Sequence, residues 1–329
     1  MDVKVLVLGG AGYIGSHMVA SLQSQNIASV VIDDLSTGFA NSVAGVPFYQ
    51  GDFANQELLQ QVFKEHQIDA VMHFAASSQV GESVSDPEKY YFNNLCKTQV
   101  LLNNMRQHQV INIVFSSTAA VYGSPQQALI NEQHPVAPMN PYGRSKLAVE
   151  WMLQDYASAY GIKAVCLRYF NAAGAAIDAS NGERHDPETH LIPLVLQALS
   201  GRRQGIKIFG TDYATPDGTC IRDYIHILDL AQAHLLAMNW LLIQSSCTYR
   251  AFNLGNGAGF SVRQVIATAK EITGQHLNEE VSARRVGDPA ILVASAEQAK
   301  QVLGWQPQYT QLQEIITHAW AWEQKLSGL

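Results

Sequence analysis

The stretch NPYGRSKLAVE, residues 140–150, places a phenol and an ammonium one helical turn apart, at Tyr142 and Lys146. Positions i and i+4 of a helix share a face, so both polar tips can point into one pocket. A free tyrosine has a pKa of about 10, and a neighbouring ammonium favours its phenolate form. The pair could therefore take a proton from a substrate hydroxyl near neutral pH. Because Tyr-x-x-x-Lys also occurs on solvated helices, the rest of the chain must decide between the two interpretations.

Three glycines near the amino terminus form a second pattern that could do chemistry. In VKVLVLGGAGYIGSH, Gly9, Gly12 and Gly15 follow a predicted strand and open a predicted helix. The first permits a tight turn, the second lets backbone approach a pyrophosphate, and the third lets helix and strand pack closely. The helix N-terminus then faces the anion. The pattern predicts a cradle for a dinucleotide.

An acidic side chain closes the next predicted strand, in VVIDDLSTG. Asp33 lies 24 residues beyond Gly9, where a carboxylate accepts hydrogen bonds from the adenosine ribose and repels a 2′-phosphate. The sequence nearby contains no arginine that could accept such a phosphate. The expected cofactor is therefore NAD rather than NADP, with Asp34 as a neighbouring candidate.

The elements that would position these groups follow a β-α-β-α rhythm in the first half of the chain. Apolar runs predict strands over residues 3–8, 29–32, 46–50, 70–74, 111–115 and 163–169. Amphipathic stretches predict helices over 55–66 and 87–108, the second with Asp86 as N-cap and Pro87 at its first position. Buried strands alternating with helices predict a doubly wound α/β fold, with a parallel sheet covered on both faces.

The rhythm changes after residue 171, where glycine-rich and turn-rich segments surround helices predicted over 191–199 and 228–240. A less regular second half suits a substrate lobe beside a nucleotide domain. We therefore expect a Rossmann domain over 1–171 and a smaller, mixed α/β substrate lobe over 172–329. A later segment near 221–255 is expected to pack back on the first domain.

Composition and charge exclude several classes of function. The 329 residues carry a formal net charge of −7, which argues against a general nucleic-acid binder. No apolar run of about 18 residues predicts a membrane span, and the amino terminus lacks the features of a signal peptide. Four separated cysteines without a CxxC pair predict reduced thiols. We expect a cytoplasmic protein that has neither a membrane nor a nucleic acid as partner.

The G-x-x-G-x-x-G spacing resembles the extended short-chain dehydrogenase/reductase superfamily. In that superfamily a hydroxyl at a strand end joins the tyrosine and the lysine around the reacting carbon. Aligned on VYG, the resemblance assigns this role to Thr118 rather than to Ser116 or Ser117. The motifs GDF and HFAA resemble the adenine contact and the strand end that borders the cofactor. The implied NAD contacts are Gly9, Gly12, Tyr13, Ile14, Gly15, Asp33, Asp34, Asp52, Phe53, Phe74, Ala75, Ala76, Ser78, Asn93, Tyr142, Lys146 and Tyr169.

Motifs from end to end of the chain together resemble the UDP-glucose 4-epimerase family, among them HFAASSQVGESV, SSTAAVYG, LRYFNAAGA and RRVGDPA. The resemblance implies transient oxidation of a UDP-hexose at C4 and reduction on its other face, with Tyr142 as the base. Arginines suit a diphosphate because their guanidinium groups bind it bidentately. The implied substrate contacts are Thr118, Asn171, His190, Leu191, Lys207, Phe209, Arg222, Arg285, Asp288 and Leu292. The resemblance also implies a homodimer.

Some positions depart from the family pattern and leave alternatives open. A bulky tyrosine four residues beyond the equivalent of Asp288 excludes N-acetylated sugars, and a small residue admits them. Leu292 is intermediate, so a UDP-N-acetylhexosamine 4-epimerase stays open. Ser78 stands where some members carry lysine, and His190 where some carry asparagine. A UDP-uronate 4-epimerase is a further alternative, although no additional cation for a C6 carboxylate is evident.

Two rivals differ more in chemistry. A nucleotide-sugar 4,6-dehydratase needs an Asp-Glu pair after the strand-end threonine, where this chain has Ala119 and Ala120. A non-catalytic NAD-binding regulator could dispense with the threonine, the tyrosine or the lysine, and all three are present. No metal is expected, since His185 and His190 lie in a predicted loop without a recognisable ligand set.

Overall fold

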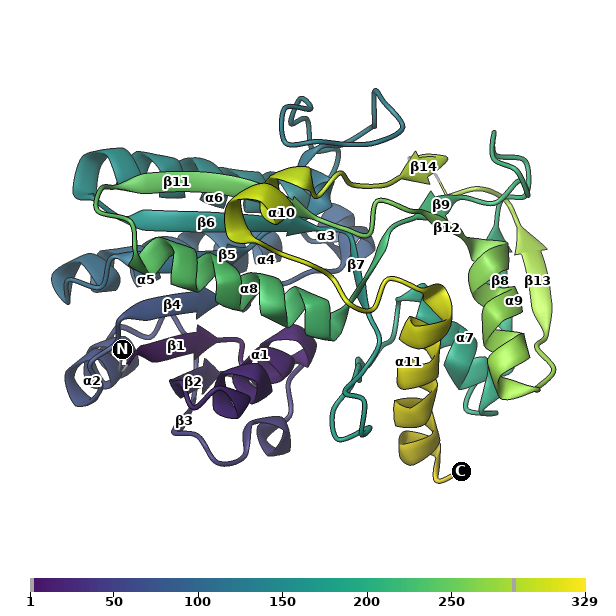
Figure 1. Cartoon of the computed structure of the whole chain (residues 1–329), viewed down its shortest axis with the longest axis horizontal. Coiled ribbons are helices and arrows are strands. Elements are labelled where there is room, and N and C mark those ends of the chain that lie inside the picture. The colour runs from purple at the N-terminus through teal and green to yellow at the C-terminus, as the bar shows by residue number, and fades with distance from the viewer. Residues whose placement is uncertain (1–2, 286–287) are drawn as a thin grey trace.

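A seven-stranded parallel sheet lies at the centre of the larger part of the molecule (Figure 1). The computed structural model describes residues 3–285 and 288–329, so Val286 and Gly287 of the RRVGDPA motif lie outside the described residues. The strand order is β11-β6-β5-β4-β1-β2-β3, and every neighbouring pair is parallel. The strands are β1 (Lys4–Leu8), β2 (Ala28–Asp33), β3 (Phe48–Gln50), β4 (Ala70–His73), β5 (Asn112–Ser116), β6 (Lys163–Tyr169) and β11 (Thr248–Leu254).

Both faces of the sheet are buried, which confirms the predicted doubly wound fold. Alternate residues of β1 serve different cores: Val5 and Val7 pack with one side's helices, and Leu6 and Leu8 with the other's. The first side is covered by α1 (Tyr13–Ser24) and α8 (Ile227–Leu242). The second is covered by α2 (Gln56–Glu65), α5 (Lys97–Gln107) and α6 (Pro141–Tyr160).

The helix predicted over 87–108 is built from three consecutive pieces. It starts as α4 (Pro87–Tyr90), with Asp86 accepting a hydrogen bond from the Lys89 amide as the predicted N-cap. It continues through a π-helical turn, η2 (Tyr91–Cys96), into α5. Short helical segments also connect the strands: η1 (Ala40–Val43), α3 (Val80–Ser85), η3 (Ala119–Val121) and α10 (Glu297–Leu303).

A smaller lobe lies to one side of the sheet (Figure 1). Its core joins α7 (Leu191–Leu199), α9 (Val262–Thr273) and α11 (Leu312–Ser327). Its strands are short: β7 (Asn171–Ala173) with β10 (Tyr224–His226), β8 (Ile206–Phe209) with β13 (Glu279–Ser282), and β9 (Ile221–Arg222) between β12 (Phe260–Ser261) and β14 (Ile291–Leu292). Within 221–255, α8 packs against the sheet and β11 pairs with β6 as its edge strand. The domain boundaries at 171 and 172 stay a prediction.

The strand order reverses direction between β1 and β4. From β1 the chain adds β2 and β3 on one side, then crosses to add β4, β5 and β6 on the other. At such a switch point, the loops leaving the carboxyl ends of the two strands diverge and open a crevice. Gly9 follows β1 there, and Phe74 follows β4. No helix within the described residues is both long and apolar enough to span a membrane.

Candidate active site

A cleft of about 2060 Å³ opens over the carboxyl ends of the strands and continues to the smaller lobe. Pockets for a single drug-sized molecule are typically about 300–1,000 Å³. The cleft therefore has room for two ligands side by side, such as a dinucleotide and a second nucleotide. Residues of β1, β2, β4, β5, α6, α7, β8 and β9 or of the loops beside them line it.

The glycines after β1 let the loop pack closely on itself and on the backbone that follows β4. Gly9 has φ +73°, and a Cβ there would lie 2.5 Å from the amide nitrogen of Ala75. A Cβ on Gly15 would lie 2.2 Å from the carbonyl oxygen of Gly9. Gly12 is the N-cap of α1 without a side-chain cap, so the helix N-terminus keeps its amides for a ligand. Residues present here fit a pyrophosphate.

Asp33 joins the glycine loop to the next strand. Its Oδ2 accepts a hydrogen bond from the Ala11 amide at 2.9 Å, and its Oδ1 accepts one from the Leu35 amide at 2.8 Å. Burial raises the pKa of Asp33, while these amide bonds oppose the rise. The carboxylate lines the cleft and holds the loop in shape at the same time. Each oxygen keeps lone-pair capacity for a ribose hydroxyl.

Helix α6 begins at the cleft and presents Tyr142 there. Asn140 caps it by accepting a hydrogen bond from the Gly143 amide at 2.8 Å, and Pro141 fills the first helical position. Tyr142 and Lys146 both line the cleft, as their spacing predicts. Tyr142 and Lys146 are therefore not a solvated pair on the surface of the helix.

Lys146 is almost fully buried, with 3% of its surface exposed. Its Nζ donates a hydrogen bond to the carbonyl oxygen of Ser116 at 2.9 Å and lies 4.7 Å from the centre of the Phe115 ring. Burial lowers the pKa of Lys146 to about 7, although Cys166 and Glu150 act to raise it. The ammonium is thus held in place by β5 and tuned close to neutral pH.

The phenol of Tyr142 has Thr118 beside it. Burial raises the pKa of Tyr142, and the hydrogen bond with the Thr118 side chain lowers it. Thr118 ends the β5 loop as the N-cap of η3, where its Oγ1 accepts a hydrogen bond from the Ala120 amide at 3.1 Å. Burial outweighs the Thr118 hydrogen bond, so the net effect is a raised pKa of Tyr142, and a phenolate needs a further positive charge in the cleft.

A buried ion pair lies behind the lysine, one helical turn further along α6. Arg168 on β6 donates to both carboxylate oxygens of Glu150, through Nε at 3.0 Å and through Nη2. Tyr122 accepts a hydrogen bond from Nη1 of Arg168 at 2.9 Å, and Ser117 donates one to Glu150. Sequence reasoning missed this network. The signal in the sequence that could have indicated it is Glu150, which lies four residues after Lys146 and therefore on the same face of α6.

Nearly all residues predicted from sequence line the cleft. Asp52 is the exception: its carboxylate pairs at 2.7 Å with Lys97 Nζ, and Lys97 lines the cleft in its place. The predicted residues that line it are Gly9, Gly12, Tyr13, Ile14, Gly15, Asp33, Asp34, Phe53, Phe74, Ala75, Ala76, Ser78, Asn93, Thr118, Tyr142, Lys146, Tyr169, Asn171, His190, Leu191, Lys207, Phe209, Arg222, Arg285, Asp288 and Leu292.

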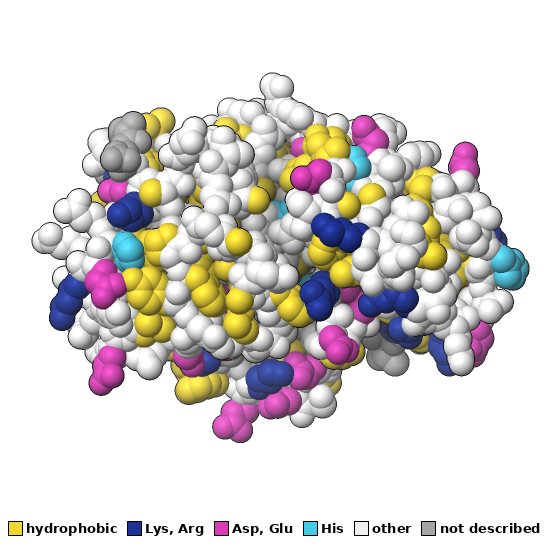
Figure 2. All heavy atoms as spheres, turned by 90° about the horizontal axis from the view of Figure 1, so that it is seen from below, with side chains coloured by type: hydrophobic (Ala, Val, Ile, Leu, Met, Phe, Trp, Pro, Cys, Tyr) yellow, Lys and Arg dark blue, Asp and Glu magenta, His cyan; other side chains and the backbone are white. Residues whose placement is uncertain are grey.

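The predicted substrate residues form contacts among themselves. Arg222 pairs with Asp288 at 2.6 Å rather than with its neighbour Asp223. The guanidinium of Arg285 lies 4.1 Å from the centre of the Phe209 ring. Figure 2 shows basic and acidic side chains mixed over the face seen from below. Phosphates bound in the cleft would therefore meet these local cations rather than a broad positive surface.

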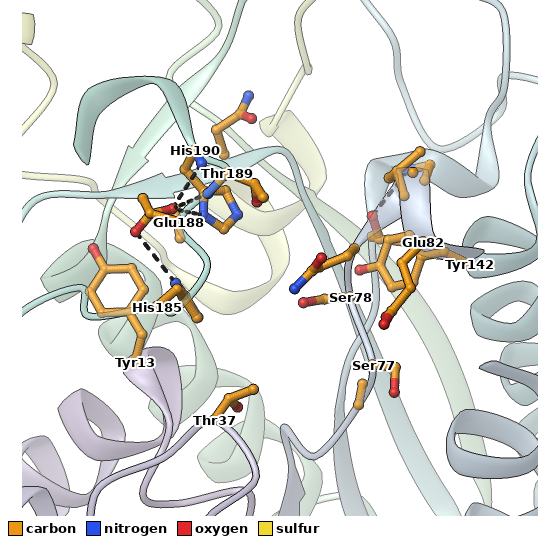
Figure 3. A pocket seen from close by; sticks show the side chains of 18 of the residues that line it. Tyr13, Thr37, Ser77, Ser78, Glu82, Tyr142, His185, Glu188, Thr189 and His190 are labelled. Carbon is orange, nitrogen blue, oxygen red and sulfur yellow. Dashed lines mark hydrogen bonds and ion pairs between the residues drawn. The ribbon is translucent and has the colours of Figure 1, made fainter. Parts of the chain in front are cut away.

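The structure also shows a cluster of four ionisable side chains on the cleft wall that the sequence analysis does not predict. Glu183, His185, Glu188 and His190 lie in the loop before α7 and line the cleft, where Tyr13 lies beside His185 (Figure 3). Burial lowers the pKa of His190, but Glu183 and Glu188 outweigh it and raise that pKa to about 10. Sequence reasoning found two histidines here without a ligand set. The glutamates at matching intervals in ERHDPETH were the signal it missed.

Comparison with known proteins gives consistent results. A family model described as the NAD dependent epimerase/dehydratase family matches residues 5–255. The UDP-glucose 4-epimerase of Halalkalibacterium halodurans is 51% identical over 323 residues, covering 98% of this chain and 96% of the relative.

Solved structures match over the same length. The UDP-glucose 4-epimerase of Brucella ovis in complex with NAD is 48% identical, with a TM-score of 0.94 and coverage of 97% of each chain. The enzyme of Bifidobacterium longum in complex with NAD+ and UDP is 36% identical, with a TM-score of 0.93, covering 99% of this chain and 100% of the other.

Proposed function

The chain belongs to the NAD-dependent epimerase/dehydratase family, and we propose that it inverts carbon 4 of a UDP-hexose with Tyr142, Lys146 and Thr118. NAD-dependent epimerisation of a UDP-sugar at C4 is its activity, which makes it an isomerase. UDP-glucose and UDP-galactose are the proposed substrate pair. The observation that carries the residue assignment is that these three side chains line the same cleft as the glycine cradle.

Tyr142 is the proposed acid and base. Its phenolate would take the proton from the C4 hydroxyl and later return it to the C4 oxygen of the 4-keto sugar. The configuration at C4 inverts because the hydride returns to the opposite face of that carbon. Thr118 would hold the substrate hydroxyl against the phenol, and its hydrogen bond lowers the pKa of Tyr142. The role proposed for the Lys146 ammonium, which β5 holds in the cleft, is to favour the phenolate by its positive charge. Bound NAD would accept the C4 hydride and return it, and the positive charge of its nicotinamide ring would favour the phenolate.

The protein's other task is to hold two nucleotides for the whole turnover. Gly9, Gly12 and Gly15 would hold the NAD pyrophosphate, and Asp33 the adenosine ribose. Arg222 and Arg285 would hold the UDP phosphates and Asp288 the uridine ribose, with uracil near residues 207–209. Firm binding of UDP leaves the hexose free to present either face, which places binding energy on groups remote from the reacting carbon.

The test is incubation of the purified protein with UDP-galactose, without added reductant, and identification of the product by NMR. Inversion at C4 without release of NADH is the expected result. A 6-deoxy-4-keto product would instead identify a dehydratase. Absence of any reaction, with NAD bound, would identify a non-catalytic regulator.

Substitution of Gly15 by alanine is expected to weaken NAD binding at least about tenfold, because a Cβ there would press on the Gly9 carbonyl and shift the cradle. Ser24→Ala is the matched control, since Ser24 is exposed at the far end of the same helix α1 and does not line the cleft. The NAD released per chain on denaturation gives the measurement. Equal NAD content in the two variants would contradict the cradle.

Leu292 sets the expected tolerance for N-acetylated sugars. It lines the cleft and is held by pairing of β14 with β9. We expect Leu292→Tyr to lower turnover of UDP-N-acetylgalactosamine about tenfold or more and to leave UDP-galactose turnover within about twofold, since the larger ring fills space that an acetyl group needs. Val281→Tyr, outside the cleft, is the control. Equal losses on both substrates would show that Leu292 does not select.

Three further expectations about this protein remain proposals: a cytoplasmic location, a role in galactose metabolism and a homodimer. Exposed apolar side chains support the dimer, since Phe92 on η2 and Trp151 on α6 are 60% and 56% exposed. These two elements pack against each other. Sedimentation velocity decides the point, because a monomer at micromolar concentration would contradict it.

A further inference from the structure

Four potential ligand atoms converge on the cleft wall before α7 (Figure 3). Ligand atoms of Glu183, His185, Glu188 and His190 all lie within 4.8 Å of one another. Nδ1 of His190 lies 2.8 Å from Oε1 of Glu183 and 2.9 Å from Oε1 of Glu188. Nδ1 of His185 lies 3.1 Å from Oε1 of Glu183 and 3.9 Å from Oε2 of Glu188.

One carboxylate oxygen in this cluster has no partner among the described residues. Oε1 of Glu188 accepts hydrogen bonds from the amides of Thr189 and His190, at 2.7 and 2.8 Å. Its Oε2 is buried without a hydrogen bond, and only 4% of the side chain is exposed. This oxygen faces His185, toward the interior of the cluster. A buried carboxylate oxygen left without a partner is costly, so the arrangement indicates a missing cation.

Spacing and ligand type indicate which cation. Two ligands bound tetrahedrally to Zn²⁺ at about 2.0–2.2 Å lie roughly 3.4 Å apart. The four N–O separations are 2.8, 2.9, 3.1 and 3.9 Å, so a small adjustment of the side chains would admit the ion. Two imidazoles with two carboxylates suit Zn²⁺ and similar transition metals, whereas Mg²⁺ and Ca²⁺ prefer oxygen ligands alone. We propose that Glu183, His185, Glu188 and His190 bind one divalent transition-metal ion of the Zn²⁺ type.

The ion would lie on the cleft wall beside the glycine loop. The Tyr13 ring packs edge-on against His185, with 6.4 Å between ring centres, and donates its own hydroxyl to the Gly174 carbonyl. The Tyr13 hydroxyl therefore does not compete for the four ligand side chains, because it is already bonded to Gly174. The four ligands do not include Tyr142, Lys146 or Thr118. His190 is also an implied substrate contact, so metal binding is measured directly rather than through turnover.

The experiment uses the full chain without a histidine tag, with its NAD bound, stripped of metal by a chelator and then gel-filtered. Titration with Co²⁺ is expected to give the intense visible absorption of a tetrahedral ion at one equivalent per chain, and Zn²⁺ should displace it. Glu188→Gln and His185→Ala should each weaken Co²⁺ binding at least tenfold, since each removes one of four ligands.

The matched control is His276→Ala, which removes an exposed histidine outside the cluster and should bind as the unaltered chain does. Circular dichroism of each variant establishes that it is folded, and the two variants test different ligands, so one misfolded protein does not decide the result. Absence of a one-equivalent absorption band would overturn the proposal. Unchanged Co²⁺ affinity in either folded cluster variant would also overturn it, and the four side chains would then be an ion-pair network.

Discussion

Tyr142→Phe is expected to lower UDP-galactose turnover by about 10²–10⁴-fold, the range that general acid–base catalysis contributes. The substitution removes one oxygen and leaves the ring, so the α6 packing and the position of Lys146 are retained. NAD content should stay that of the unaltered protein, because the glycine cradle and Asp33 are untouched. Turnover is measured by NMR of the product sugar, and NAD by its release on denaturation.

Tyr160→Phe is the matched control on the same helix. Tyr160 lies at the last position of α6, is 49% exposed and packs its ring against Arg106. Its hydroxyl is remote from the cleft, so its removal should leave turnover within about twofold. If Tyr142→Phe keeps more than about one-tenth of the activity, the base is misassigned, and Thr118 becomes the next residue to test.

The fold could be predicted from sequence largely because parallel strands carry strong local signals. The predicted helix over 191–199 coincides with α7, and each predicted strand of the first half overlaps an observed one. The π-helical turn between α4 and α5 was not foreseen. It changes the hydrogen-bond register of the backbone without interrupting the apolar spacing, which is the property that sequence reasoning reads.

The site was foreseen where a motif is local and missed where partners meet only in three dimensions. Tyr142 and Lys146 share one helical turn, whereas Arg222 reaches Asp288 in a distant loop. Its neighbour Asp223 is turned inward instead and accepts hydrogen bonds from the amides of Asn256 and Ala294, at 2.9 and 3.1 Å. That two residues of opposite charge are neighbours in the sequence, as Arg222 and Asp223 are, therefore did not predict which residues form an ion pair.

Arg168→Met is expected to destabilise the protein by about 3–5 kcal/mol, the cost of leaving a buried carboxylate without its partner. Glu150 is 1% exposed and Arg168 6%, so water cannot replace the guanidinium. Methionine occupies much of the volume of the arginine methylene groups, so lost packing should account for only a small part of the destabilisation. Urea unfolding followed by circular dichroism, at saturating NAD, measures the change.

Two comparisons isolate the charge. Lys300→Met breaks the exposed pair with Glu297, whose side chains are 44% and 64% exposed, and should change stability by less than about 0.5 kcal/mol. Adding Glu150→Met to Arg168→Met removes the orphaned carboxylate and should recover part of the loss. If the double variant is instead destabilised by the sum of both single effects, the two side chains act independently. Glu150 would then contribute to stability by packing rather than by its ion pair with Arg168, because a coupled pair cannot give additive losses.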